Sequence, residues 1–233
     1  MITIALMASQ AVSANAATSV EVDGNLLQPG RSCYAIVANG QTIGRTVQTI
    51  TVISVESAPS WQIEVHQKLD NGTFELRDTF VVKRDTLQPV SLRSERGTDR
   101  NAPGWQRVTV KYADGFVTGS KETAGGIVPL LARVPDPVWD GNLWGLMFAG
   151  LPLRDGASFQ IPFWQYDKGL GRFDLQVKGS QMVQTPGSPI DAWVVEAGTD
   201  PARTTRYLIG KDSRKELGYS AGPMEQVLQD DCS

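Results

Sequence analysis

Histidine is almost absent from this sequence, because His66 is the only one among 233 residues. A site that pairs a serine or cysteine nucleophile with histidine would therefore have to use His66. That residue lies on the polar phase of its predicted strand with no recognisable partner, so we expect it to face solvent. The motifs of serine hydrolases, zinc proteases, P-loop proteins and dinucleotide-binding enzymes are absent as well. These absences predict a protein that is not an enzyme and that needs no cofactor.

A catalytic carboxylate pair is the main enzymatic alternative, since it needs no histidine. The acidic residues Asp155, Asp167, Asp174 and Asp191 lie beside glycine, lysine or proline. Turn and surface roles are the default for such positions. An envelope hydrolase is therefore the weakest of three functional hypotheses, and carboxylates that converge in one cleft would strengthen it.

Cysteine is scarce too, with Cys33 near one end of the chain and Cys232 next to its last residue. There is no CxxC pair, so no metal site of the zinc-binding kind is predicted. In an oxidising compartment the two cysteines can pair and tie the chain ends together. A bond that closes so long a loop would stabilise the fold by about 4–5 kcal/mol in the loop-entropy model. The alternative is two unrelated thiols.

Long apolar runs and N-terminal basic residues are also missing. The run from Ile2 to Ala8 is too short to span a bilayer, and no other candidate for a transmembrane segment exists. Ala14-Asn15-Ala16 fits the small-x-small pattern before a cleavage point, so we predict a signal peptide at residues 1–16. A start codon assigned too late would explain the missing basic region. The alternative is a disordered or strand-forming segment, whereas export implies a periplasmic or secreted protein.

Charge and size exclude one class of partner and indicate one folded unit. The net charge of −3 and the pI near 5.3 offer no attraction to nucleic acid phosphates. Hydrophobic residues make up 41% of the chain, which is ordinary for a globular protein. We predict one domain over residues 17–233, because β domains of this size are commonly single units.

A strand-turn-strand phrase occurs twice, at residues 81–90 and 208–217. Each copy has an apolar strand end, a basic residue, then Asp followed by Thr or Ser, and then a second strand. Asp, Ser and Thr side chains hydrogen-bond their own backbone and hold tight turns. Alternation of apolar Trp61, Ile63 and Val65 with polar neighbours indicates a half-buried strand of the same kind. The chain therefore predicts a large antiparallel sheet built from hairpins.

One segment breaks the strand pattern. Asp136 suits the cap of a helix, Pro137 its first position and Gly150 its end. The apolar residues between them follow mixed spacings of three and four, which predicts a buried helix of roughly three to four turns. Gly141 and Gly145 each weaken this prediction by up to about 1 kcal/mol. We expect a mainly β fold in which a large curved antiparallel sheet, or half-barrel, wraps around this one apolar helix.

The segments LPLRDGASF (151–159), VKGS (177–180), AWVV (192–195) and TRYLI (205–209) resemble a family of exported bacterial domains of unknown function, number 3108 or a close relative. The similarity covers roughly residues 70 to 220. It consists of apolar and turn positions and contains no catalytic signature. The family resembles periplasmic half-barrels that carry lipoproteins, so the resemblance implies a curled sheet with an apolar concave face.

The functional indication is aromatic, because large side chains gather around the predicted helix. If the half-barrel is not filled, they would line a groove for an acyl chain or another lipid-like ligand. The residues concerned are Trp139, Leu143, Trp144, Met147, Phe148 and Trp164. The simpler alternative is that they form the core. The leading hypothesis is a non-enzymatic protein that binds or carries a hydrophobic ligand or envelope component, and the second is an adaptor with a filled core that contacts another envelope protein.

Overall fold

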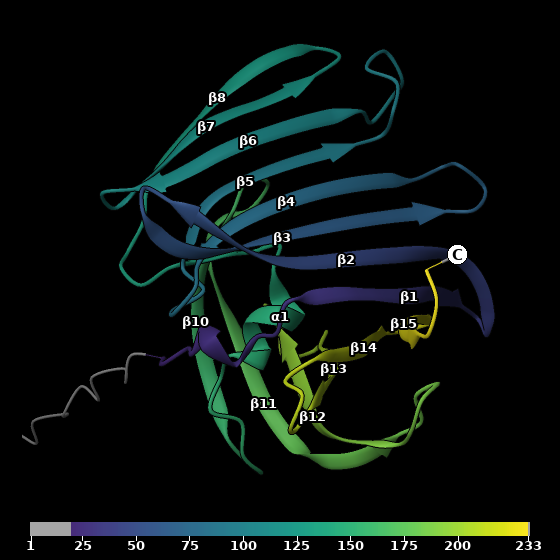
Figure 1. Ribbon diagram of the computed structural model, residues 1–233. Coiled ribbons are helices and arrows are strands. Elements are labelled where there is room, and N and C mark those ends of the chain that lie inside the picture. Colours follow the sequence, from purple (N-terminus) through teal and green to yellow (C-terminus); the bar gives the residue numbers. More distant parts are fainter. Residues whose placement is uncertain (1–19, 233) are drawn as a thin grey trace, which may run out of the picture.

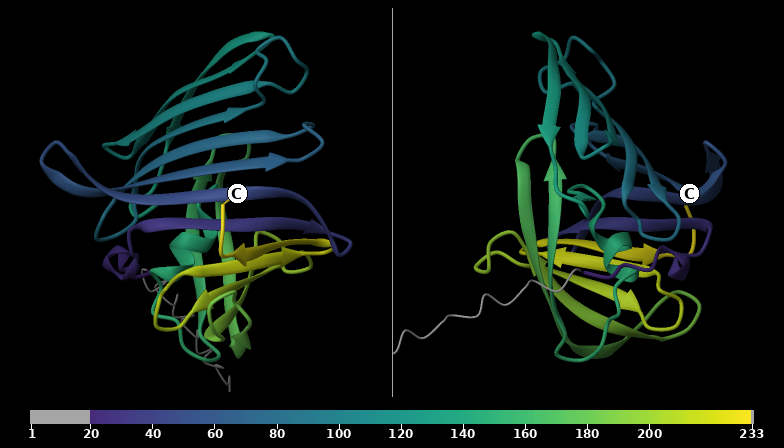
Figure 2. Two further views of the ribbon diagram at one scale, coloured as in Figure 1. Left: turned by 45° about the vertical axis from the view of Figure 1, so that its right-hand side comes forward. Right: turned by 90° about the vertical axis from the view of Figure 1, so that its left-hand side faces the viewer.

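The computed structural model describes residues 20–232, and the predicted signal peptide at 1–16 lies outside them. Its 15 strands form one sheet in the order β8-β7-β6-β5-β4-β3-β2-β1-β15-β14-β13-β12-β11-β10-β9. Neighbouring strands are antiparallel apart from the short parallel contact between β9 and β10. The sheet curves so that strands from the two halves of the chain face a common interior (Figures 1 and 2). The predicted mainly β fold with one large curved sheet is therefore confirmed.

The strands of the first half are β1 (Gly30–Ala38), β2 (Gln41–Val55), β3 (Ala58–Leu69), β4 (Glu75–Lys83), β5 (Pro89–Arg96), β6 (Gln106–Ala113), β7 (Phe116–Thr123) and β8 (Gly126–Arg133). Those of the second half are β9 (Trp139–Asp140), β10 (Ser158–Gln165), β11 (Gly169–Val183), β12 (Ile190–Gly198), β13 (Thr205–Gly210), β14 (Glu216–Ala221) and β15 (Met224–Gln229). The helical elements are a 3-10 turn η1 (Gly24–Leu26) and the helix α1 (Trp144–Ala149).

The expected long helix is wrong, because α1 has only six residues. Trp139 and Asp140 instead form β9 and pair with β10. The Asp140 carboxylate then accepts hydrogen bonds from the backbone and side-chain nitrogens of Asn142, both at 2.9 Å. Such a local turn competes with helix formation, and Gly141 adds its low helix propensity. The sheet therefore does not wrap around a buried helix of several turns.

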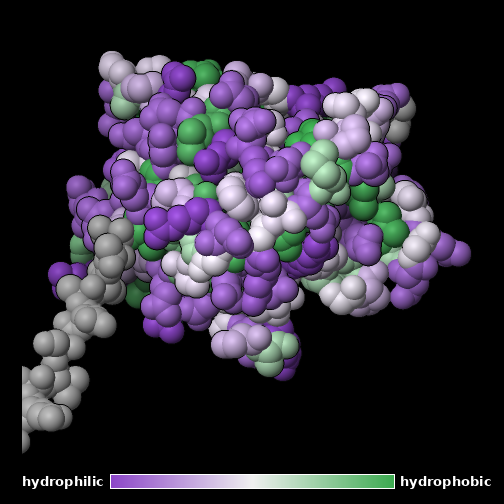
Figure 3. Space-filling model, turned by 90° about the horizontal axis from the view of Figure 1, so that it is seen from below, coloured by the Kyte–Doolittle hydropathy of each residue, from purple (hydrophilic) through white to green (hydrophobic). Residues whose placement is uncertain are grey.

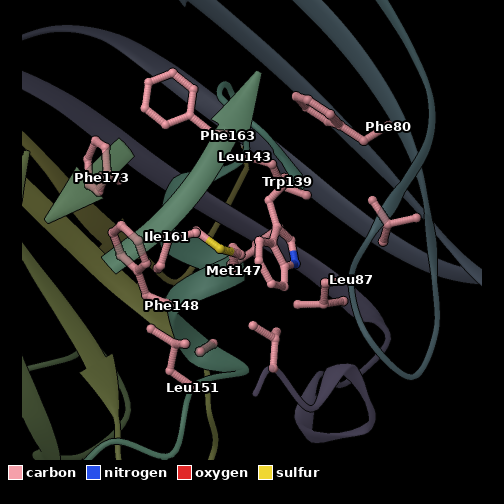
Figure 4. Packing of buried hydrophobic residues seen from close by; sticks show 14 of the residues in the cluster. Phe80, Leu87, Trp139, Leu143, Met147, Phe148, Leu151, Ile161, Phe163 and Phe173 are labelled. Atoms are coloured by element: carbon pink, nitrogen blue, oxygen red, sulfur yellow. The ribbon is translucent and has the colours of Figure 1, made fainter. Parts of the chain in front are cut away.

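Side chains of the sheet itself fill most of the interior, and α1 adds to them (Figure 4). On the inner face of β2–β6, one buried apolar residue from each strand lines up across the sheet. This apolar row consists of Ile50, Ile63, Phe80, Leu92 and Val110. Directly paired residues point to the same face of a sheet, so the row forms one continuous apolar wall.

Two residues further along each strand, the same face becomes polar. The mixed row consists of Gln48, Val65, Asp78, Ser94, Val108 and Lys121. The next step gives the outer polar row of Thr46, Gln67, Leu76, Arg96, Gln106 and Thr123. The concave face thus changes from apolar to polar along the strand direction.

The two copies of the hairpin phrase fold identically, at positions 127 residues apart. In the first copy the backbone nitrogen of Leu87 donates to the carbonyl of Lys83 at 3.0 Å, and in the second Arg214 donates to Gly210 at 3.0 Å. Leu87 and Arg214 also share a left-handed backbone, with φ of 54° and 51°. The strand pairs shift register at equivalent places, between Val81 and Val82 and between Leu208 and Ile209. The fold therefore uses one hairpin, including its bulge, in both halves of the sheet.

The C-terminal end of the described chain is bonded to the first strand. A disulfide links Cys33 of β1 to Cys232, with 5.1 Å between the Cα atoms and 199 residues between them in sequence. Of the two alternatives that the sequence left open, the structure has the bonded one. It fastens the segment after β15 to the middle of the sheet, where β1 also pairs with β15.

The surface in Figure 3 is mainly hydrophilic, with hydrophobic residues in small separate groups. Among residues 20–232, no helix is long and apolar enough to cross a membrane.

Candidate ligand-binding cavity

A cavity of about 220 Å³ lies on the inner face, between the mixed row, the outer polar row, β13–β15 and the start of α1. Its walls combine apolar side chains with carboxyl, amide and hydroxyl groups. The lining residues are Thr46, Gln48, Val65, Gln67, Leu76, Asp78, Phe80, Asn142, Leu143, Trp144, Gly145, Leu146, Tyr207, Glu216, Tyr219 and Gln226. Such a lining suits a ligand with both an apolar and a polar part.

Asp78 is a buried carboxyl on the β4 side of the cavity. Its side chain is 8% exposed, and its Oδ1 atom has no hydrogen-bond partner among the described residues. Burial raises the pKa of Asp78 to about 6. The Ser94 hydroxyl and the positive charge of Arg96 oppose this shift, and the negative charge of Asp140 assists it. An unsatisfied buried carboxyl oxygen is costly and calls for a donor that the protein itself does not supply.

Glu216 is a second carboxyl that lines this cavity, from β14 in the other half of the sheet. Residues Gly218 and Glu216 of β14 pair with Leu208 and Ile209 of β13, so Leu217 is the extra residue of a β-bulge. The bulge places Glu216 on the inner face, where a regular strand would have placed its neighbour. Glu216 is 5% exposed, and burial raises the pKa of its carboxyl to about 7.

The Glu216 carboxyl is not hydrogen-bonded to the rest of residues 20–232, but its oxygens, unlike Asp78 Oδ1, are not fully buried. The carboxyl packs against the Gly145 backbone, where a Cβ atom would lie 2.0 Å from Oε2. The phenol of Tyr34 donates to the main-chain carbonyl of Glu216 at 3.0 Å and leaves the carboxyl free. A residue larger than glycine at position 145 would thus push the carboxyl out of its place.

The remaining polar wall is partly satisfied within the protein. The Thr46 hydroxyl donates to Gln226 Oε1 at 2.8 Å, which joins β2 to β15 across β1. Tyr207 and Tyr219 pair across β13 and β14, with ring centroids 5.7 Å apart. Burial raises the pKa of both phenols, so they remain protonated donors at neutral pH.

Of the six residues predicted to bind a ligand, the structure brings only Leu143 and Trp144 to this cavity. Trp144 is half-buried and stacks on Phe173 with 3.9 Å between ring centroids. The other four are at most 4% exposed and belong to the core: Trp139, Met147, Phe148 and Trp164. His66 is exposed and lies 2.8 Å from Glu75, away from the cavity.

Asp78 and Glu216 were not predicted from the sequence. Asp78 has a readable signal, because it stands in the apolar phase of β4 between Leu76 and Phe80. The alternation of apolar and polar residues gives no such signal for Glu216, because the bulge changes the face to which the residues before it point. Alignment of the two hairpin phrases would have helped, because Glu216 is then equivalent to Pro89, which is buried on the inner face.

A second cavity of about 320 Å³ adjoins the first, and Gln48 and Leu146 line both. Its charged lining residues are all basic: Arg31, Arg214 and Lys215. Within the described chain, no group of three or more His, Cys, Asp or Glu side chains could hold a metal ion. Acidic and basic groups are therefore segregated into neighbouring cavities on the two sides of Leu146.

Comparison with known proteins gives a family and a fold. The profile of a family described as "Protein of unknown function (DUF3108)" matches residues 33–219. The chain is similar to a crystal structure of a beta-barrel-like protein of the domain of unknown function DUF1849 from Brucella abortus. The TM-score is 0.53 at 14% identity, over 87% of this chain and 95% of that one, so the likeness concerns the fold alone. No curated protein matches the chain.

Proposed function

The chain belongs to the DUF3108 family of proteins of unknown function, and we propose that it is an exported, non-enzymatic protein that binds an amphipathic component of the bacterial envelope. The cavity between Asp78 and Glu216 is the site. The observation that carries this proposal is a cavity lined by two carboxyls, in which Asp78 Oδ1 is buried without a partner, while Phe80, Leu143 and Trp144 provide apolar walls. A protein with a purely structural interior would fill such a space with apolar side chains.

Export is part of the same proposal. The Cys33–Cys232 disulfide supports it, because disulfides persist in oxidising compartments such as the periplasm. The mass of the mature protein, recovered from the periplasm of a producing bacterium, should correspond to a chain that starts near Ala17. A chain that stays in the cytoplasm with residues 1–16 attached would contradict export.

Ligand binding is tested by native mass spectrometry of the periplasmic protein, followed by organic extraction. We expect a co-purifying mass of lipid size. Val65→Trp should remove it, because Val65 is a half-buried lining residue and the larger ring fills the cavity. His66→Trp is the matched control, since it places the same ring on the exposed side of the same strand. An empty protein that takes up no added envelope lipid would contradict the proposal.

An adaptor is the second candidate, favoured by the edge strand β8. Ile127, Val128 and Leu131 on this strand are 66%, 59% and 76% exposed. Exposed apolar side chains on a sheet edge suit contact with another protein. A folded, ligand-free protein that loses a cross-linked envelope partner on Leu131→Asp would favour this role.

The two carboxyls also keep the hydrolase hypothesis testable, since Asp78 and Glu216 line one cavity with raised pKa values. We expect no turnover of aryl glycosides or esters by the purified protein. Turnover that Glu216→Gln abolishes in a folded protein would replace the binding role with a catalytic one.

A further inference from the structure

We propose that the ligand's polar end is a cationic amine, which the buried carboxyls of Asp78 and Glu216 attract into the cavity that both of them line. This inference rests on the binding role proposed above and narrows the class of ligand. It concerns an amphiphile with a protonated primary amine at its head, as opposed to a neutral alcohol or an anionic carboxylate or phosphate.

The first argument is the absence of a cation paired with either carboxyl, since Arg96 acts on Asp78 electrostatically but forms no ion pair with it. Within residues 20–232, neither Asp78 nor Glu216 takes part in an ion pair. No lysine or arginine lines their cavity in this part of the chain. Buried carboxylates are normally paired or bound to a cation, so a positive group from outside completes the site.

The second argument is hydrogen bonding. Among the described residues, Asp78 Oδ1 is fully buried without a donor. A primary ammonium carries three N–H donors and no acceptor, which suits a cavity lined by carboxyl and amide oxygens such as those of Asp78 and Gln67. A carboxylate or phosphate head would bring only acceptors to these oxygens.

The third argument is the separation of charges along the interior. The adjoining cavity beyond Leu146 is lined by Arg31, Arg214 and Lys215 and by no acidic residue. An anionic head is therefore attracted to that cavity and repelled from the one between Asp78 and Glu216. Head-group charge thus distinguishes the two cavities in a binding experiment.

The test uses octylamine, octanol and octanoate, three probes with the same chain and different heads, in isothermal titration of the purified full chain at pH 8. We expect octylamine to bind about tenfold more tightly than octanol, as one charged hydrogen-bonded contact implies. Octanoate should bind only in the adjoining basic cavity, so Arg214→Gln with Lys215→Gln should abolish its binding and leave the preference for octylamine over octanol unchanged. This preference is measured on the unsubstituted protein, so it does not depend on the folding of any variant.

Variants then locate the effect. Asp78→Asn with Glu216→Gln should reduce the preference for octylamine over octanol to less than about threefold. The matched control is Asp85→Asn with Asp212→Asn, which changes the net charge equally at two exposed hairpin turns. This control should keep the tenfold preference if the preference arises at the two cavity carboxyls. Loss of the preference in the control would instead indicate a non-specific attraction of the amine to the negative charge of the protein.

Three outcomes separate the two proposals. If none of the probes binds, the proposed binding function fails. If octylamine binds no more tightly than octanol, the function stands and the amine inference is overturned. If the exposed control pair loses the preference as fully as the Asp78 and Glu216 pair does, the inference is also overturned.

Discussion

The two repeated hairpins share a backbone and differ in the side chains that they turn inward. In the hairpin of β4 and β5, the left-handed residue is Leu87 and the residue before the bulge is Pro89, and both are buried. In the hairpin of β13 and β14, the equivalent residues are Arg214 and Glu216, which line the basic and the acidic cavity. The same bulged hairpin therefore places apolar side chains in the core in one half of the sheet and charged side chains at the cavities in the other half.

This difference separates stability from function within one fold. Leu87 packs against Gly24 and Gly150, where added Cβ atoms would lie 2.7 Å and 3.2 Å from its methyl groups. Figure 4 shows Leu87 next to Trp139, whose indole nitrogen donates to the Thr86 carbonyl at 3.1 Å. Arg214 instead donates to the Leu151 carbonyl at 3.1 Å and lines the basic cavity. The first hairpin therefore packs into the hydrophobic core, and the second lines a cavity.

The largest expected effect on the free energy of unfolding comes from removing the buried side chain of Leu87. Leu87→Ala should lower the free energy of unfolding by about 2–5 kcal/mol, because it leaves a cavity among the glycine backbones. The matched Arg214→Ala should cost about 1 kcal/mol, the net value of one hydrogen bond. Both substitutions keep the left-handed backbone, so its strain cancels from the comparison. Urea unfolding measures the pair, and equal losses would show that the two hairpins do the same structural work.

Glu216 should give a smaller effect that depends on pH. Its pKa is raised from 4.5 to about 7 in the fold, so the native state holds more protons than the unfolded state between these values. Stability therefore falls as pH rises through this window and levels off above about pH 7. Glu216→Gln should stabilise the protein by on the order of 3 kcal/mol at pH 8 and by almost nothing at pH 4.

Thermal unfolding at pH 4, 6 and 8 follows this difference. Asp212→Asn in the exposed turn of the same hairpin is the control for the loss of one negative charge. Asp78, with its pKa raised to about 6, titrates equally in both proteins and cancels from the comparison. A Glu216→Gln difference of the same size at all three pH values would contradict a desolvated carboxyl.

The sequence predicts the sheet well because its signals are local. Alternation at Trp61, Ile63 and Val65 and the repeated Asp-Thr and Asp-Ser turns were sufficient for strands and hairpins, and the family resemblance over residues 70 to 220 is confirmed. The helix at 136–150 failed because a side-chain turn at Asp140 and strand pairing of Trp139 outweigh apolar spacing. The site was missed for a different reason. Its two carboxyls come from strands that meet only through the curvature of the whole sheet.

The smallest expected effect tests whether the two turns are equivalent. Thr86 Oγ1 accepts from the backbone nitrogen of Gln88 at 3.4 Å, and Ser213 Oγ accepts from Lys215 at 3.3 Å. Thr86→Ala and Ser213→Ala should each cost about 0.5–1 kcal/mol in urea unfolding, since each removes one weak turn contact. Equal losses would show that both halves depend on the same backbone device. A much larger loss at Ser213 would mean that the second turn, beside the charged cavities, is held by its side chain more than the first. The cavity walls would then depend on the turn for their shape, and the contrast between the two hairpins would extend to their backbones.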